Sequence, residues 1–404
     1  MPSTAPTSLA GHPPLPVRRA RGAVGVLFFV NGALFASLVP RYPDLKAGLG
    51  LSNAAFGTAI AAYALGALVV GLLAGALVSR WGSVRVALLA FVGAAANLLL
   101  IALAPSWAAL ALTLFVAGSF DALADVANNA HSLRVERLYR RSILNALHGV
   151  WSVGAVVGAV GGGLAAREGM PLEAHLAVVA VLLVTAAAVA SRRLLPGPDR
   201  VQPTDGRPAA ARPGAHRHHL VVARTVVVLG VVAATGQAME EAGSTWSAVY
   251  LRDELGAAAF TASLAYAALQ ALQTVGRLVA DRFVDRHGDR SVARAGAALA
   301  CAASTGALLV PSALTTVLAF GAVGLGIGTL IPASMRAANA VPALPPGVGL
   351  ALAASVLRLS GLVTAPVVGL VADATDLRTA LVVVPVAALV AVALAPALPR
   401  RRAG

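Results

Sequence analysis

Residues 55–85 read AFGTAIAAYALGALVVGLLAGALVSRWGSVR, in which an apolar run over 55–78 is followed by Arg80 and Arg85. About 20 apolar residues suffice for a helix to cross the hydrocarbon core of a bilayer. The run therefore predicts a membrane-spanning helix that ends at a basic loop. Similar runs recur along the chain, and the twelve predicted spans are 22–42, 55–78, 84–104, 107–131, 144–167, 172–191, 224–250, 258–280, 292–310, 313–335, 347–372 and 378–398.

Basic residues are distributed unevenly between the two sides of the membrane that these spans define. Of the 31 Lys and Arg residues, 24 lie in the termini and in the gaps after even-numbered spans, and five lie in the other gaps. The remaining two, Arg277 and Arg358, lie within spans. Cytoplasmic loops of membrane proteins carry the excess of positive charge. Both termini are therefore predicted to be cytoplasmic, in a protein of the cell's inner membrane.

The composition excludes several classes of protein. With 58% hydrophobic residues and a mean hydropathy of +0.81, the chain is too apolar for a soluble globular protein. A net charge of +14 suits a nucleic-acid-binding protein, but the basic residues lie in short loops and not on one soluble face, so no nucleic-acid partner is expected. The sequence offers no nucleophile–base arrangement, metal-ligand cluster or phosphate-binding loop in a coherent context, so we expect neither an enzyme nor a cofactor or metal.

Polar segments divide the chain into two halves. Residues 1–21 form a predicted cytoplasmic tail, and the apolar run that follows is longer than the core of a signal peptide, so an uncleaved helix is expected. A linker rich in Pro, Gly, Arg and His over 192–223 separates a six-span half over 22–191 from another over 224–398. Residues 399–404 form the predicted C-terminal tail.

The two halves share landmarks at a nearly constant offset. Parallel repeats related by an axis along the membrane normal are one architecture of secondary transporters, in which the substrate binds between the halves. The matching landmarks, 206 or 207 positions apart, are Leu49-Gly50 and Leu255-Gly256, Arg80 and Arg286, Gly82 and Gly288, Gly118 and Gly324, Gly154 and Gly361, and Gly162 and Gly369.

Charged residues within the predicted spans are the main candidates for function. An Asp or Arg at a helix centre costs roughly 2.5–3.5 kcal/mol, so such residues are expected to face a cavity or one another. Asp121 and Asp125, four residues apart, share one face of the fourth span, and Glu240 and Glu241 lie near the middle of the seventh. Because neighbouring carboxylates cannot both ionise cheaply, we expect these four acids to carry protons. The alternative is a fixed ion pair between Arg358 and one of the two glutamates.

Polar and aromatic side chains within the spans extend this pattern. They can hydrogen-bond to a hydroxylated solute or stack against it, although each alone also suits a contact between helices or an interfacial anchor. Together they predict a polar central cavity with the substrate-binding residues Asn31, Asn128, His148, Trp151, Trp246, Gln270, Gln273 and Arg358.

The segment Gly75-Ala-Leu-Val-Ser79-Arg80-Trp-Gly82-Ser-Val-Arg85 resembles the signature of the loop between helices 2 and 3 in the major facilitator superfamily, Gly-x-x-x-Asp-Arg-x-Gly-x-Arg. Ser79 stands where that signature has an acid, which weakens a conformational latch in this half. The second half keeps Asp285-Arg286-His-Gly288-Asp-Arg290, with Asp281 in place of the leading Gly. The resemblance implies that both loops bias the cytoplasmic gate, through Arg80, Gly82, Arg85, Asp285, Arg286 and Gly288.

Three further strings are similar to the rhizopine-transporter-like subgroup of that superfamily, which is related to sugar and polyol permeases such as the fucose–proton symporters. They are DALADVANNAH at 121–131, LHGVWSVG at 147–154 and EEAGSTWSAVYL at 240–251. The resemblance covers essentially the whole chain. It implies a polyol- or amino-cyclitol-like solute and makes Asp121, Asp125, Glu240 and Glu241 the functional acids.

A competing signal points to export. The string Gly154-xxx-Gly158-Ala159-xx-Gly162-Gly163 resembles the helix 5 motif of drug–proton antiporters, with Ala159 where that motif has Pro. A drug or metabolite exporter driven by proton exchange is therefore the alternative within transport. A membrane sensor or scaffold that transports nothing is the alternative outside it.

Taken together, these features predict an all-α membrane protein of twelve transmembrane helices in two pseudo-symmetric six-helix halves. We expect a monomeric, proton-coupled secondary transporter that works by alternating access. Its expected partners are the lipid bilayer, protons and a small polar solute such as a sugar, a polyol or an amino-cyclitol.

Overall fold

The computed structural model describes residues 14–140, 142–197, 216–341, 344–345 and 347–399. Much of the predicted N-terminal tail, linker and C-terminal tail lies outside the described residues. Within them the regular secondary structure is helical throughout. The elements are α1 (Leu15–Leu38), η1 (Val39–Arg41), α2 (Tyr42–Gly48), α3 (Asn53–Trp81), α4 (Ser83–Ala102), α5 (Trp107–Tyr139), α6 (Leu144–Arg167), α7 (Leu172–Ser191), α8 (His216–Asp253), α9 (Ala259–His287), α10 (Asp289–Leu309), α11 (Ala313–Ile327), α12 (Leu330–Asn339), α13 (Val348–Ala374), α14 (Leu377–Ala380), α15 (Val383–Leu394) and η2 (Ala395–Ala397).

Eleven helical segments among the described residues are long and apolar enough to cross a membrane. The twelfth membrane helix is α9, which packs against α6 and α11. It is less apolar because it carries Tyr266, Gln270 and Gln273, all of which are buried. A polar group that faces lipid finds no partner, so these side chains explain why α9 belongs in the interior of the bundle.

The helix bounds reproduce the repeat that the sequence predicts. α3 and α9 each contain 29 residues, and both their first and their last residues are 206 positions apart. Gly82 and Gly288, which follow these helices, have φ angles of 84° and 80°, a conformation that favours glycine. Ser106 and Ser312 cap α5 and α11 alike, because each side chain accepts a hydrogen bond from the amide three residues on.

Close backbone contacts are repeated as well. A Cβ added at Gly118 on α5 would lie 1.9 Å from the carbonyl oxygen of Tyr63 on α3. A Cβ added at Gly324 on α11 would lie 2.1 Å from the carbonyl oxygen of Leu269 on α9. Helices in lipid associate through such close packing of small residues, since lipid supplies no hydrophobic drive between them. Both pairs obey the 206-residue offset.

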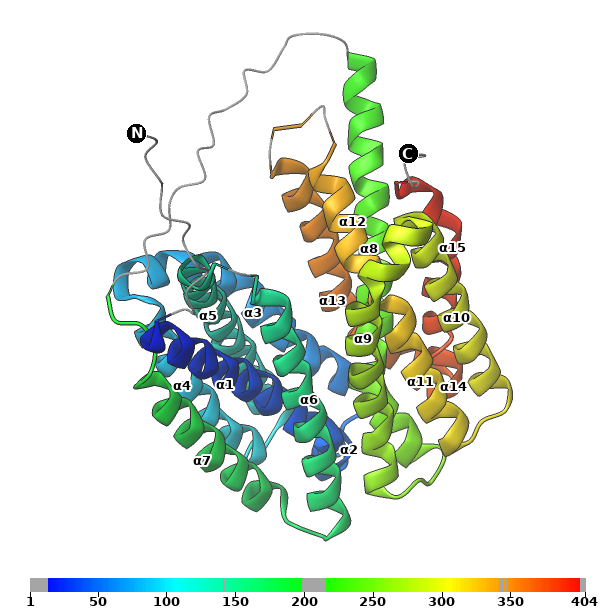
Figure 1. Ribbon diagram of the computed structural model, residues 1–404. Helices are drawn as coiled ribbons and strands as arrows, with labels where there is room; N and C mark the ends of the chain where they lie inside the picture. Colours follow the sequence, from blue (N-terminus) through cyan, green and yellow to red (C-terminus); the bar gives the residue numbers. More distant parts are fainter. Residues whose placement is uncertain (1–13, 141, 198–215, 342–343, 346, 400–404) are drawn as a thin grey trace, which may run out of the picture.

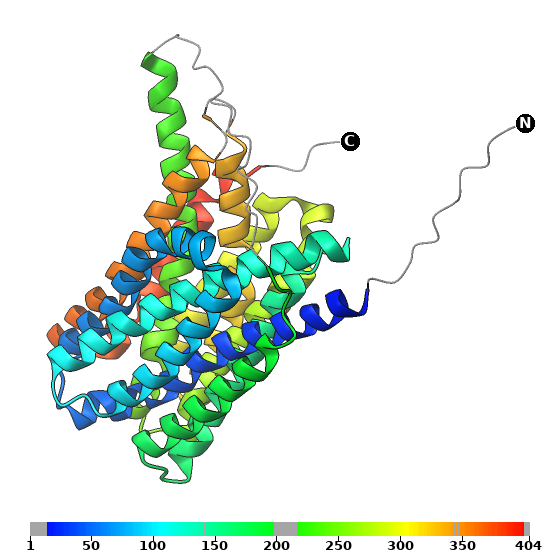
Figure 2. The same ribbon diagram turned by 90° about the vertical axis from the view of Figure 1, so that its left-hand side faces the viewer.

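The helices form two bundles, with α1–α7 at the left and α8–α15 at the right of Figure 1. In the view turned by 90°, the helices α1–α7 run side by side at a slant (Figure 2). The bundles meet along two equivalent helix pairs, because α6 packs against α9 and α13 packs against α3.

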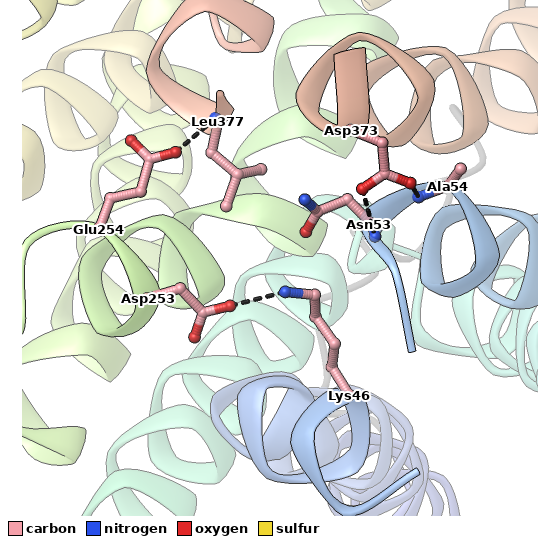
Figure 3. A network of polar contacts seen from close by, with 7 residues as sticks. All are labelled: Lys46, Asn53, Ala54, Asp253, Glu254, Asp373 and Leu377. Atoms are coloured by element: carbon pink, nitrogen blue, oxygen red, sulfur yellow. Dashed lines mark hydrogen bonds and ion pairs between the residues drawn. The ribbon is translucent and has the colours of Figure 1, made fainter. Parts of the chain in front are cut away.

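One end of the molecule is closed by contacts between the halves. It is formed by η1 and α2, by the turn between α8 and α9, and by the turn between α13 and α14. Lys46 Nζ lies 2.7 Å from Asp253 Oδ2, and the Asp373 carboxylate accepts hydrogen bonds of 2.8 Å from the amides of Asn53 and Ala54 (Figure 3). A helix N-terminus presents free amides and partial positive charge. Asp373 thus caps α3 from the opposite half, and we call this the closed end.

At the other end the halves enclose a cavity of about 400 Å³. Its lining includes His148 and Ser152 from α6, Arg277 and Asp281 from α9, and Arg336 from α12. We call this cavity the vestibule and this end the open end. The structure therefore represents one conformation, sealed at one end and hollow at the other.

Candidate functional site

The first half holds its site acids on α5. Asp121 is half-buried and lines a small cavity of about 40 Å³ with Asn31 from α1 and Tyr63 from α3. The Tyr63 hydroxyl is a hydrogen-bonding partner of the Asp121 carboxyl group. The cavity has room for a water molecule and offers it polar partners. Asp121 therefore faces the interior of its own half, as well as the plane where the halves meet.

Asp125 lies one turn further towards the open end and has different surroundings. It is exposed, and Asn129 Nδ2 donates a hydrogen bond of 2.9 Å to Asp125 Oδ1. The titratable group within electrostatic reach of Asp125 is His148 on α6. Asn128, by contrast, is buried, and neither polar atom of its side chain has a partner among the described residues. The two aspartates share a helix face, but it is Asp125 that lies within electrostatic reach of His148, a residue of the vestibule wall.

The second half holds its acids on α8. Gln273 Nε2 on α9 donates a hydrogen bond of 2.7 Å to Glu240 Oε2. Thr245 Oγ1 donates one of 2.9 Å to Glu241 Oε1. Hydrogen bonds to charged acceptors are stronger than those between neutral groups, so these partners hold the two carboxylates in place. The predicted glutamine and glutamate are thereby brought together.

Three tyrosines lie near the acids of the two halves, and they were not predicted from the sequence. Tyr266 on α9 lies within electrostatic reach of Asp121 and of both glutamates, and it accepts a hydrogen bond of 3.0 Å from Gln270. Tyr63 lies within reach of Tyr266, and Tyr42 within reach of Glu241. The sequence does hold a signal for two of them. Only five tyrosines occur in the chain, and Tyr63 corresponds to position 269, which lies one helical turn from Tyr266 in the other half.

The acids of the two halves lie at a similar depth. Asp121 follows the first residue of α5 by 14 positions, and Glu240 precedes the last residue of α8 by 13, both counted from the closed end. At a rise of about 1.5 Å per residue, each lies about 20 Å into the helix. Asp121 and Glu240 therefore lie near one plane inside the membrane-spanning region.

His148 lies on the vestibule side of α6, whereas Trp151 is half-buried and packs against the apolar core. His148 is exposed, and its ring packs edge-to-face on Phe28 with the centroids 5.3 Å apart. Arg277 lines the vestibule from α9 and is within electrostatic reach of His148. The sequence places Arg277 within a predicted span but assigns it no role. The structure shows that its side chain lines the vestibule, which its position along the chain does not indicate.

Trp246 lies in the closed end and not in the vestibule. Its side chain has no exposed surface, and its ring packs edge-to-face on Phe56 of the first half at 5.9 Å. Phe56 in turn packs on Tyr42 at 5.5 Å. A Cβ added at the neighbouring Gly57 would lie 2.4 Å from the carbonyl oxygen of Ala365. In this conformation Trp246 is part of an aromatic plug between the halves.

The four site acids have no ion-pair partners among the described residues. The ion pairs there join Arg41 and Asp44, Lys46 and Asp253, Arg167 and Glu168, Arg252 and Asp44, and Arg336 and Asp289. All of these lie at helix ends. Arg358 is exposed, and no carboxylate of the described residues lies within 4.0 Å of it. The fixed pair with Glu240 or Glu241 that the sequence left open is not formed in this conformation.

The residues expected to form gating loops lie around two turns at the open end, after α3 and α9. Gly82 and Gly288 form the turns themselves, and the exposed members are Arg80, Arg85, Asp285 and Arg286. In the first turn Ser79 donates a hydrogen bond to the carbonyl oxygen of Ala76 and brings no charge. Beside the second turn Asp289 pairs with Arg336 at 2.8 Å, which ties α10 to α12.

The sequence profile of the Major Facilitator Superfamily matches residues 24–239 and 226–404. An uncharacterized transporter, y4wD, of Sinorhizobium fredii is 30% identical over 376 residues, which cover 92% of this chain and 96% of that protein. Membrane protein MosC of Rhizobium meliloti is 28% identical over 382 residues, covering 92% of this chain and 88% of that protein.

Two solved structures share the fold. The nucleoside transporter NupG superposes with a TM-score of 0.74 at 14% identity, covering 94% of this chain and 98% of its own. A D-xylose–proton symporter superposes with a TM-score of 0.70 at 14% identity, covering 96% and 98%. At this identity the likeness concerns the fold alone.

Proposed function

The chain belongs to the major facilitator superfamily of secondary transporters, and from this premise we propose that it moves a small, polar, hydroxylated solute together with protons. Family membership confirms the resemblance read from the loop motifs, the twelve-helix fold and the prediction that the chain is not an enzyme. The observation that carries the proposal is the arrangement of the four acids, which lie within the membrane-spanning helices without ion-pair partners among the described residues.

Protons supply the neutralisation that these acids otherwise lack. An ionised carboxylate at a helix centre costs roughly 2.5–3.5 kcal/mol, and no Arg or Lys of the described chain lies within 4.0 Å to offset this cost. When the halves rock, the surroundings of Asp121 and Glu241 change together, because Tyr266 of the second half lies within electrostatic reach of both acids. Taking up a proton in one conformation and releasing it in the other is what couples a proton gradient to transport.

The groups near this plane suit a hydroxylated solute. Gln270, Gln273 and Asn31 carry amides that can both donate and accept hydrogen bonds, and the indole of the half-buried Trp151 offers a flat surface for a sugar or cyclitol ring. The vestibule, at about 400 Å³, falls in the size range of small-molecule sites, roughly 300–1,000 Å³. These features support a sugar, polyol or amino-cyclitol.

We place both termini in the cytoplasm, in the cell's inner membrane, because of the excess of basic residues on that side. The vestibule then opens to the cytoplasm, and the end closed by Asp373 and Lys46 faces outwards. One chain supplies both halves of the site, so the transport unit is a monomer.

The test is solute-driven proton movement in liposomes that contain the purified protein and the pH dye pyranine. D-xylose, myo-inositol and an amino-cyclitol are added outside in turn, and at least one should change the internal pH with wild-type protein. Asp121→Asn should abolish this proton movement and retain exchange of labelled solute for unlabelled solute, because exchange needs no net proton transfer. Glu173→Gln, an exposed acid at the closed end, is the matched control and should behave as wild type.

Three other results would reject the proposal in distinct ways. Uptake of solute without proton movement would remove the coupling. Proton movement with hydrophobic cations and not with the polyols would favour the exporter. The absence of any solute-dependent flux would favour a sensor or scaffold, provided that a thermal denaturation curve shows the protein to be folded.

A further inference from the structure

A groove runs along the outside of the second half, between α10 and the segment formed by α14 and α15. Its volume is about 510 Å³. Among the residues that line it, Leu309 is 71% exposed and Leu389 is 60% exposed, although both belong to helices that cross the membrane. Apolar side chains exposed on such helices form a surface for lipid. The groove therefore opens to the bilayer.

The groove begins at the closed end and extends inwards. Leu309 is the last residue of α10, and Cys301, which also lines the groove, lies eight positions before it. At about 1.5 Å per residue, Cys301 lies about 12 Å deeper. On the facing helix α15, Leu389 follows the first residue, Val383, by six positions, or about 9 Å. The groove is therefore deep enough for part of an acyl chain that enters from the closed end.

Two opposite charges line the groove at its closed-end mouth. Asp376 is the N-cap of α14, and Arg378 is the second residue of that helix. Both are exposed, and they do not lie within 4.0 Å of each other. Arg378 Nε donates a hydrogen bond of 2.7 Å to the carbonyl oxygen of Leu308, which holds the guanidinium group against the end of α10. The mouth therefore presents one positive and one negative group that do not neutralise each other.

Both charged groups keep capacity for a ligand. Neither Nη atom of Arg378 has a hydrogen-bond acceptor among the described residues, and arginine binds phosphate oxygens through paired N–H groups. The two oxygens of Asp376 accept one hydrogen bond each from the amide and the hydroxyl of Thr379. A carboxylate has about four acceptor sites. Arg378 can thus hold a phosphate, and Asp376 can hold an ammonium group.

The charges around the mouth favour a zwitterionic headgroup. Glu254 lies beside Arg378 and accepts a hydrogen bond of 3.2 Å from its amide, so two carboxylates surround one guanidinium group. A lipid with a net negative charge would be repelled by them and would leave Asp376 without a cation. Phosphatidylcholine has a cation but no N–H to donate. Phosphatidylethanolamine has both the phosphate for Arg378 and the N–H groups for Asp376.

The headgroup has to supply the selection. Moving an acyl chain from the bilayer into an apolar groove gains little, because lipid tails are as apolar as leucine. The charged residues lie at the helix ends, and the apolar lining continues from there towards Cys301 and Leu389. A lipid in the groove therefore keeps its headgroup at the membrane surface and its chain deeper in the bilayer.

We propose that this groove binds one phosphatidylethanolamine of the membrane, with its phosphate at Arg378, its ammonium group at Asp376 and one acyl chain along Leu309 and Leu389. Both walls belong to the second half, so the site keeps its shape when the halves move against each other. This inference goes beyond the proposed solute transport and does not depend on it.

The test is lipid retention by the purified full-length protein, measured by native mass spectrometry with phosphatidylethanolamine, phosphatidylcholine and phosphatidylglycerol of identical acyl chains. Phosphatidylethanolamine should be retained about two- to fivefold better than either other lipid, the range expected for an exposed ion pair. Asp376→Asn should abolish this preference, because asparagine still caps α14 but carries no charge. Arg378→Gln should lower the retention of phosphatidylethanolamine by a similar factor.

Two matched controls separate the site from general effects. Arg167→Gln removes another exposed arginine at the closed end, in the first half and outside the groove, and should retain phosphatidylethanolamine as wild type does. Thr305→Phe, which fills the groove, should reduce the retention of all three lipids. Ala302→Phe, at an exposed position of the same helix outside the groove, should not.

Equal retention of phosphatidylethanolamine and phosphatidylcholine by wild type would overturn the proposal. So would a preference that survives in Asp376→Asn, or equal losses in Thr305→Phe and Ala302→Phe. Thermal denaturation in lipid-free detergent identifies a variant that has lost its fold.

A measurement on wild-type protein alone keeps the proposal testable if a variant fails to fold. Phosphatidylethanolamine with a photoreactive group in its acyl chain should label peptides of α10 and α15, and labelling confined to other helices would contradict the site. Solute-driven proton movement is measured separately, so failure here leaves the proposed function unaffected.

Discussion

The two halves share one backbone plan, yet they carry their charge on different helices. In the first half Asp121 and Asp125 lie on α5, and the positions 206 residues further on are Ile327 and Ile331. In the second half the acids at 240–241 lie on α8. The packing glycines occupy equivalent positions in the two halves, whereas the intramembrane carboxylates do not.

This difference teaches that the halves are equal as scaffolds and unequal as carriers of charge. A carboxylate within lipid needs a proton or a polar partner. Some of the polar groups around each acid come from the opposite half, since Tyr266 of the second half lies within electrostatic reach of Asp121 of the first. The relative position of the halves therefore controls the surroundings of each acid.

The largest effect is expected at Glu241, one of the acids that the first half does not repeat at the equivalent position. Glu241→Gln should abolish accumulation of solute driven by a pH gradient, because the second half then lacks the carboxylate that Thr245 holds. Uptake of labelled solute into liposomes measures this, with Glu173→Gln as the control. Normal accumulation by Glu241→Gln would show that the first half carries the protons alone.

The shared scaffold predicts equal damage at equivalent glycines. Gly118→Ala and Gly324→Ala each push a Cβ against a carbonyl oxygen of the neighbouring helix, and overpacking of this kind costs about 1–3 kcal/mol. Thermal denaturation in detergent should show two similar losses.

Gly75→Ala and Gly306→Ala are the matched controls, because a Cβ at either meets no atom within 4 Å. Each should leave stability unchanged or raise it by up to about 1 kcal/mol, since alanine favours a helix over glycine. Very unequal losses at Gly118 and Gly324 would break the equivalence of the halves.

A smaller effect is expected where one half caps a helix of the other. Asp373→Asn removes the charge that caps α3, which should weaken the closed end by about 1 kcal/mol, or about fivefold in its equilibrium. In a Cys301→Ser background, a cysteine introduced by Ser263→Cys, which faces Gly163 across the halves, should react with maleimide correspondingly faster.

Glu254→Gln is the matched control, because Glu254 caps α14 within its own half. It accepts hydrogen bonds from the amide of Leu377 (Figure 3) and from the amide of Arg378. This control should lower stability without raising the reactivity at position 263. An unchanged rate in Asp373→Asn would mean that the cap does not hold the halves together.

The smallest effect is expected at the partly exposed pair of Lys46 and Asp253. Such pairs contribute about 0.2–1 kcal/mol and are screened by salt. Lys46→Gln should raise the maleimide reactivity at position 263 slightly at low salt, and the difference from wild type should disappear at about 1 M salt. A difference that persists at high salt would indicate a role other than charge pairing.

The sequence predicted the parts of the fold that depend on length and repetition. Span lengths, loop charges and the 206-residue offset fixed twelve helices in two halves, and the bounds of α3 and α9 follow that offset at both ends. Even α9, whose glutamines make it the least apolar span, is predicted from the length of its apolar run over 258–280.

What sequence alone did not reveal depends on which helix faces meet across the halves. Tyr63 and Tyr266 read as ordinary span residues until their proximity to Asp121 was known. Trp246 was expected to bind solute, and its burial against Phe56 belongs to the closed conformation. The interruption between α11 and α12, at Gly328–Thr329, carries no proline, and such a break cannot be distinguished in a sequence from the packing glycines around it.

The most direct test of the account is a pair of distances measured along the same two helices. Spin labels at Arg85→Cys and Ser291→Cys report the open end of α4 and α10, and labels at Leu103→Cys and Leu309→Cys report their closed end; all four positions are exposed and each pair obeys the 206-residue offset. With Cys301 replaced by Ser, acidification in liposomes should shorten the first distance and lengthen the second, and Asp121→Asn should weaken this response. Distances that stay fixed, that change in the same direction, or that respond to pH equally in wild type and Asp121→Asn would contradict proton-driven rocking of the two halves.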